Sequence, residues 1–85
     1  MIHVIIKYAE SAFNHGIKEE DIYHAVLTPV YDEIQDSGDD KHLLIGFDRS
    51  LNILEIAYHI IDEQTFKVFH AMKCRKSYYE KLKRR

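Results

Sequence analysis

The sequence predicts an α+β domain in which two amino-terminal helices precede an antiparallel sheet of four or five strands. Apolar residues recur at helical spacing in the first third of the chain. From Tyr31 onward, short apolar runs alternate with turn residues, which is typical of strands joined by hairpins. The 85 residues suffice for one hydrophobic core and are too few for two, so a single domain over residues 1–85 is expected.

The segment up to Pro29 predicts a strand and two helices. Ile2–Lys7 is rich in β-branched side chains, which favours a strand buried on both faces or placed at an edge. Tyr8–His15 has apolar residues at helical spacing, and Gly16 follows where a left-handed cap is expected. A second helix begins near Lys18, because acidic residues fill its first turn, and it ends before Pro29.

The rest of the chain predicts four strands and a basic tail. The mixed alternation after Val30 favours a half-exposed edge strand, and Ser37–Asp40 reads as a turn. Three further strands, joined by turns at 48–52 and 62–65, are expected at His42–Phe47, Ile53–Ile61 and Phe66–Met72. Ser77–Arg85 is expected to form a short basic helix.

The charge of the chain is divided between two regions. Residues 67–85 contain eight Lys or Arg and one carboxylate, a net charge of +7, whereas residues 1–66 have a net charge of −9. The total of −2 hides this division. Because salt screens distant charges, a basic cluster attracts phosphates through its local field. The tail therefore indicates an anionic ligand, and the acidic remainder indicates a second partner.

Composition argues against several classes of protein. No run approaches the roughly 20 apolar residues that cross a bilayer, and the amino terminus lacks the basic lead and cleavage site of a signal peptide. Cys74 is the single cysteine, so neither an internal disulfide nor a thiolate metal pair can form. The histidines lack the spacing of a zinc motif. We therefore expect a cytoplasmic protein with no membrane segment, metal or cofactor.

Four segments resemble one family of small bacterial proteins. Ser11–Ile22 is similar to the helix-turn-helix opening of that family, and Leu44–Arg49, Leu54–Ile56 and His70–Tyr78 follow in the same order. Together they make most of the chain similar to the BrnT-like toxins of the RelE/ParE ribonuclease toxin superfamily. Asn14 departs from the pattern, since many relatives have lysine there.

The resemblance implies a toxin of a bacterial toxin–antitoxin system that cleaves RNA without a metal and inhibits translation. In such chemistry a base takes the 2′-hydroxyl proton, an acid protonates the leaving 5′-oxygen, and cations stabilise the phosphorane. The implied partners are RNA and a cognate antitoxin, in a homo-oligomer or a toxin–antitoxin heterotetramer. Two alternatives stay open: a non-catalytic interaction domain of the same fold whose basic tail docks an acidic partner, and a toxin directed at DNA gyrase.

Five residues are candidates for the catalytic cluster: His70, Arg75, Tyr78, His15 and Glu55. His70 could act as an acid or base, since imidazole titrates near neutral pH, or it could bond the backbone at a strand end. Arg75 could hold a phosphate with its forked donors or pair with the acidic body. Glu55, between Leu54 and Ile56, is either exposed on the open face of the sheet or functional.

The remaining candidates also have two interpretations each. His15 precedes Gly16, so a structural cap and a catalytic imidazole are both open. Tyr78 or Tyr79 could stack on a base, although helical spacing against Leu82 favours one of them in the core. The residues expected to contact RNA are Arg49, Lys73, Lys76, Lys81 and Arg84, of which the first could instead pair locally.

Overall fold

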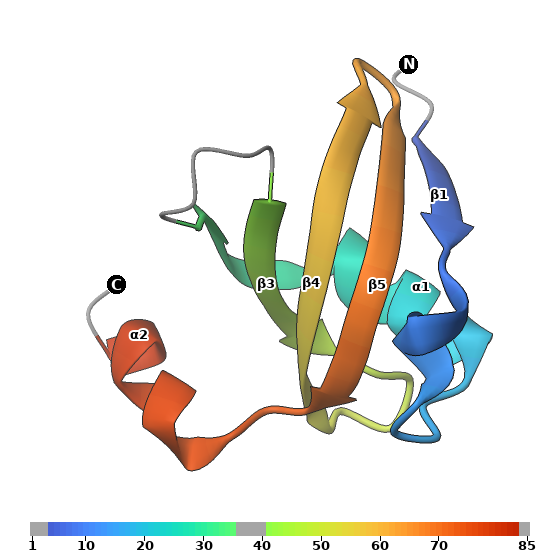
Figure 1. Ribbon diagram of the computed structural model, residues 1–85. Coiled ribbons are helices and arrows are strands. Elements are labelled where there is room, and N and C mark those ends of the chain that lie inside the picture. Colours follow the sequence, from blue (N-terminus) through green and yellow to red (C-terminus); the bar gives the residue numbers. More distant parts are fainter. Residues whose placement is uncertain (1–3, 36–40, 84–85) are drawn as a thin grey trace.

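The computed structural model describes residues 4–35 and 41–83 (Figure 1). Within them the chain forms a five-stranded sheet with the order β1-β5-β4-β3-β2. The strands are β1 (Ile5–Tyr8), β2 (Pro29–Ile34), β3 (Lys41–Phe47), β4 (Ile53–Asp62) and β5 (Thr65–Lys73). The helices are α1 (Glu19–Leu27) and α2 (Tyr79–Lys83), with 3-10 helices η1 (Glu10–Phe13) and η2 (Lys76–Tyr78). This is the predicted α+β class.

The sheet is mixed, so the prediction of a purely antiparallel sheet is wrong in one place. Strands β2 to β5 pair antiparallel in chain order, as their short turns require. The edge strand β1 pairs parallel with β5, with Ile5 opposite Thr65. This direction is set by the long connection between the two strands, and no local pattern encodes it.

The first predicted helix is also wrong, because Tyr8–His15 contains only the single 3-10 turn η1. Tyr8 belongs to β1, and the N–H of Ala9 continues the pairing by donating to the carbonyl of Val68 at 2.8 Å. Gly16 has the predicted left-handed conformation, with φ of 76°. Too few residues remain between these limits to offset the cost of nucleating an α-helix.

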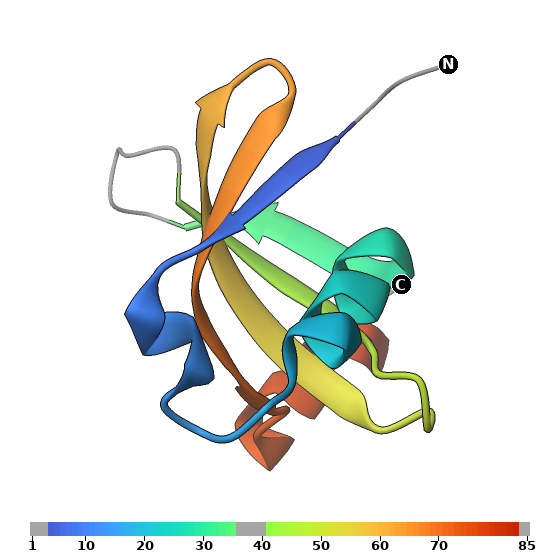
Figure 2. The same cartoon turned by 90° about the vertical axis from the view of Figure 1, so that its right-hand side faces the viewer.

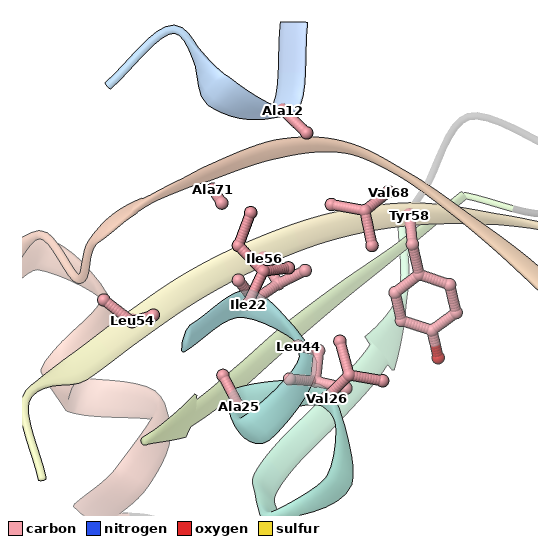
Figure 3. Close-up of a cluster of buried hydrophobic side chains, with 10 residues drawn as sticks. All are labelled: Ala12, Ile22, Ala25, Val26, Leu44, Leu54, Ile56, Tyr58, Val68 and Ala71. Carbon is pink, nitrogen blue, oxygen red and sulfur yellow. The ribbon is translucent and has the colours of Figure 1, made fainter. Parts of the chain in front are cut away.

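The hydrophobic core lies between α1 and one face of the sheet (Figure 2). Ile22, Ala25 and Val26 of α1 pack on alternate residues of β4, where Leu54 and Ile56 are fully buried. Figure 3 shows the cluster, which also contains Ala12, Leu44, Tyr58, Val68 and Ala71. Because strand residues alternate between faces, the residues between Leu54, Ile56 and Tyr58 point to the opposite face, called here the open face.

Strand β3 and helix α1 approach closely at Gly46. A Cβ atom at this position would lie 2.1 Å from the backbone carbonyl oxygen of Ala25. The substitution Gly46→Ala should therefore push α1 off the sheet and lower the free energy of unfolding by at least about 1–3 kcal/mol. Urea denaturation should show a lower midpoint than for wild type, while the exposed turn variant Ser50→Ala stays within about 0.5 kcal/mol of it. An unchanged midpoint for Gly46→Ala would contradict this close approach.

The remaining boundaries agree with the predictions where they can be compared. β3, β4 and β5 each lie within one residue of the predicted spans, and β2 is an edge strand as expected. The predicted turn at Ser37–Asp40, the strand start at Ile2 and the tail end at Arg84–Arg85 lie outside the described residues. Along the described ranges, no helix has the length and apolar character needed to cross a membrane.

Candidate active site

The open face of the sheet carries a groove of about 430 Å³. Its floor contains Ala57 of β4, whose register neighbours are Leu43 on β3 and His70 on β5. One wall comes from η1 and the loop that follows it, and the other comes from η2. The small side chain of Ala57 leaves room between its larger neighbours. All five residues predicted for the catalytic cluster line this groove: His15, Glu55, His70, Arg75 and Tyr78.

The carboxylate of Glu55 is the centre of the cluster, and it is fully buried. Its Oε1 accepts hydrogen bonds from the backbone N and the Nε of Arg75, at 2.9 and 3.1 Å. Its Oε2 lies 2.8 Å from Nη2 of Arg75 and 3.1 Å from Nε2 of His70. These four contacts match the approximate acceptor capacity of a carboxylate. Of the two alternatives for Glu55, exposure on the open face is therefore wrong.

The segment after β5 explains why a residue on the open face is buried. The backbone N–H of Cys74 donates to the carbonyl of Ile53 at 2.9 Å, which extends the β4–β5 pairing one residue beyond Lys73, and the next residue already lies against the side chain of Glu55. Arg75 then meets Glu55 with both its backbone and its side chain. The sequence places these residues 20 apart, and the β4–β5 hairpin brings them into contact.

The ion pair fixes the charge of both partners. Burial alone would raise the pKa of Glu55, but hydrogen bonds from the side chain and backbone of Arg75 and from His70 outweigh it and hold the pKa below its usual value. The hydrogen bonding between the two side chains, together with the negative charge of Glu55, raises the pKa of Arg75. The groove therefore contains an ionised, saturated carboxylate and a guanidinium at neutral pH.

His70 is oriented by this carboxylate. An ionised carboxylate can only accept hydrogen bonds, so Nε2 of His70 carries a proton and Nδ1 remains to take up or release one. The alternative of a strand-end histidine bonded to the backbone is wrong, since His70 lies within β5 and contacts a side chain. The exposed ring of His15 stands nearly perpendicular to it, with ring centroids 5.4 Å apart. Two imidazoles thus share one wall of the groove.

A β-bulge places a second side chain beside His70. Ala57 pairs with His70 and Tyr58 pairs with Val68, so Phe69 is the extra residue of β5. A bulge turns two consecutive side chains toward one face. Both Phe69 and His70 therefore line the groove, and the ring of Phe69 stacks on His59 with centroids 4.5 Å apart. Strict alternation along the sequence cannot predict this arrangement.

Tyr78 packs against Arg75 rather than in the core. Nη2 of Arg75 donates to the Tyr78 hydroxyl at 3.0 Å, and the guanidinium carbon lies 4.8 Å from the ring centroid. Tyr79 is 39% exposed, and no residue of η2 or α2 that the structure describes is buried. The expectation that one of the two tyrosines is a core residue is wrong, because α1 already fills the hydrophobic face.

The predicted RNA-contacting cations do not all reach the groove. Arg49 bonds Asp21 of α1 at 2.9 Å, on the face opposite the groove. Lys81 lies beside the groove. Its Nζ is 3.5 Å from Oε1 of Glu33 and 5.5 Å from the centroid of the Tyr31 ring. Lys73 and Lys76 are exposed but do not line the groove, and Arg84 lies outside the described residues.

Among the groove residues that were not candidates from the sequence are Lys41 and Phe69. The Nζ of Lys41 lies 5.8 Å from the centroid of the Phe69 ring. Lys41 lies two residues before Leu43 and therefore on the same face of β3, and this spacing is the signal that could have indicated it. In the described part of the chain, no group of three or more His, Cys, Asp or Glu side chains is arranged to hold a metal.

Comparison with known proteins adds a structural likeness. No protein-family model matches the chain, and no match was found among curated proteins. Among solved structures, the crystal structure of the Brucella abortus ribonuclease toxin BrnT is similar, with a TM-score of 0.63. The alignment covers 89% of this chain and 100% of that chain, at 15% sequence identity. The chain therefore has the fold of the BrnT ribonuclease toxin, as its sequence motifs predicted.

Proposed function

We propose that this chain is a toxin that cleaves RNA by acid–base catalysis and thereby inhibits translation. The observation that carries the proposal is the groove in which an imidazole and a guanidinium contact a buried, ionised carboxylate, with a second imidazole beside the first. These are the groups that transfer of a phosphoryl group to the 2′-hydroxyl requires. The fold shared with a ribonuclease toxin supports the same reaction class.

His70 and His15 are the proposed base and acid. Nδ1 of His70 takes the proton of the 2′-hydroxyl as that oxygen attacks phosphorus, and Glu55 stabilises the imidazolium that forms. His15 gives a proton to the 5′-oxygen as its bond to phosphorus breaks. The products are a 2′,3′-cyclic phosphate and a 5′-hydroxyl, so no water or metal enters the cleavage step.

Arg75 is the proposed ligand of the phosphate. Three of its five N–H donors, one on Nε and two on Nη2, are directed at Glu55 and Tyr78. The two N–H groups of Nη1 remain for a phosphate oxygen, and the side chain is 53% exposed. Tyr78 fixes the plane of the guanidinium. Glu55 is a positioning residue in this scheme, because its oxygens are already occupied by Arg75 and His70.

Cleavage by purified protein tests the proposal. We expect RNA to be cleaved in the presence of excess EDTA, because the groove supplies acid, base and cation from side chains and the oxygens of Glu55 are saturated. Gel analysis of labelled RNA with and without the chelator measures this. Complete loss of cleavage with EDTA, restored by Mg²⁺ or Mn²⁺, would show that the proposed mechanism is wrong.

An antitoxin is the proposed protein partner, and it would neutralise the toxin by covering the groove. A second function, a non-catalytic domain that docks an acidic protein, is favoured by the exposed cations Lys73, Lys76 and Lys83, which lie outside the groove. The RNA assay separates the two functions. A protein that cleaves no RNA, yet binds an acidic partner with strong salt dependence, would have the second function.

A further inference from the structure

The ring of Phe69 lies in the groove immediately beside His70. The bulge in β5 turns the ring to the open face, and the carbonyl of Phe69 accepts a hydrogen bond from Oγ of Ser11 at 2.7 Å. This bond ties the bulge to η1. The side chain is half-buried, so part of the ring remains accessible in the groove.

Two neighbours lie against this ring, the aromatic ring of His59 and the cation of Lys41. His59 stacks on Phe69 with an interplanar angle of 26°, and Lys41 lies on the strand beside His59, to which it is paired in register. The ammonium of Lys41 is 5.8 Å from the ring centroid. Aromatic rings beside a cation are the arrangement by which proteins hold bases of single-stranded nucleic acids, since bases stack and phosphates pair.

The space next to the Phe69 ring is open and has polar groups at its rim. Ala57 leaves the floor free between His70 and Leu43, and the side-chain amides of Asn14 and Gln35 line the same groove. An amide both donates and accepts hydrogen bonds, which suits the edge of a base. None of these residues is needed for proton transfer in the proposed mechanism.

We propose that Phe69, His59 and Lys41 form a binding subsite for the nucleobase adjacent to the cleaved phosphate. The inference rests on the proposed ribonuclease function for the position of that phosphate at His70 and Arg75. The base stacks on the Phe69 ring in place of the Lys41 ammonium, which then meets the neighbouring phosphate. The subsite thereby restricts the substrate to single-stranded RNA, whose bases are free to leave a helical stack.

Binding of an uncleavable oligonucleotide tests the subsite. The probe is a short single strand in which every nucleotide is 2′-deoxy and one base in turn is 2-aminopurine, whose fluorescence falls on stacking. Wild type should quench the probe at one position. Phe69→Leu should abolish this quenching and weaken binding roughly 5- to 150-fold, the effect of losing one base–aromatic stack. Phe69→Trp should restore both.

Two further variants separate stacking from charge and from folding. Lys41→Gln should retain quenching but reduce the slope of log affinity against log salt by about one. Phe13→Leu removes an aromatic ring that packs at a tilt against Tyr8 and does not line the groove, and since Phe13 is 38% exposed the variant should behave as wild type. Urea denaturation of each variant confirms that folding is retained.

The outcomes distinguish this inference from the proposed function. If Phe69-dependent quenching occurs but RNA is not cleaved, the subsite stands and the ribonuclease proposal is wrong. If RNA is cleaved while Phe69→Leu binds and quenches as wild type does, the subsite is wrong and the ribonuclease proposal stands. A wild-type protein that binds the probe without quenching at any position also overturns the subsite.

Discussion

The substitution His70→Ala is expected to lower kcat/KM for RNA cleavage by about 10²–10⁴-fold, the usual contribution of a positioned acid or base. The reason is geometric. Glu55 holds Nε2 of His70 at 3.1 Å and leaves Nδ1 for the proton of the 2′-hydroxyl, and no other side chain of the cluster has this arrangement among the described residues. Single-turnover cleavage of labelled RNA measures the effect.

The control for this variant is His24→Gln. His24 lies on α1, where its Nδ1 is 2.7 Å from the carbonyl oxygen of Phe47, and it does not line the groove. Its loss should leave cleavage unchanged. Because Glu55 keeps its three hydrogen bonds from Arg75, His70→Ala should remain folded. Cleavage by folded His70→Ala at the wild-type rate would remove His70 from the mechanism.

The substitution Glu55→Gln is expected to have the second largest effect, on both stability and cleavage. The amide keeps the size of the side chain but loses the charge, and in either orientation its NH₂ group faces donors of Arg75, which cannot accept a hydrogen bond. Hydrogen bonds to a charged group contribute about 1.5–3 kcal/mol. Since Arg75 is half exposed, we expect a loss of roughly 1–3 kcal/mol in the free energy of unfolding.

The pH dependence of this loss has a defined sign. The pKa of Glu55 is lower in the folded protein than in the unfolded chain, so its contribution is present above the unfolded value of roughly 4.5 and disappears as the pH falls through the folded value. Wild type and Glu55→Gln should therefore converge in stability under acidic conditions. Urea denaturation from pH 7 to pH 3 measures this, with the exposed variant Glu63→Gln as control. A constant difference across this range would contradict the ion-pair account.

Cleavage by Glu55→Gln separates positioning from direct participation. A positioning role predicts that kcat falls because Arg75 and His70 lose their orientation. Glu55→Asp, which keeps the charge but shortens the side chain, should recover part of the stability at pH 7 and less of the activity. Full activity in Glu55→Gln would show that neither neighbour depends on the carboxylate.

The strands could be predicted from the sequence because their signals are local. The turns at 48–52 and 62–65 and the runs between them fix β3, β4 and β5 to within one residue. The hairpins then determine which neighbours pair. The parallel pairing of β1 with β5 has no such signal, since it depends on the path of the intervening chain.

The members of the candidate site could be named, but their arrangement could not. Spacing and resemblance placed His70, Arg75 and Tyr78 near one another, and the structure brings His15 and Glu55 to them. Burial of Glu55 depends on the chain after Cys74 lying against its side chain, where Arg75 bonds the carboxylate, which is a tertiary contact. The sequence did not indicate Phe69, because a bulge breaks the alternation from which strand faces are predicted.

The end groups of the cleaved RNA test the central claim most directly. The groove is proposed to activate the 2′-hydroxyl through His70 and to protonate the leaving oxygen through His15. Mass spectrometry of the fragments made by wild type in EDTA should show 2′,3′-cyclic phosphate and 5′-hydroxyl ends, and RNA with a 2′-deoxy nucleotide at the cleavage position should stay intact. Fragments with 3′-hydroxyl and 5′-phosphate ends, or cleavage at the 2′-deoxy position, would contradict the account.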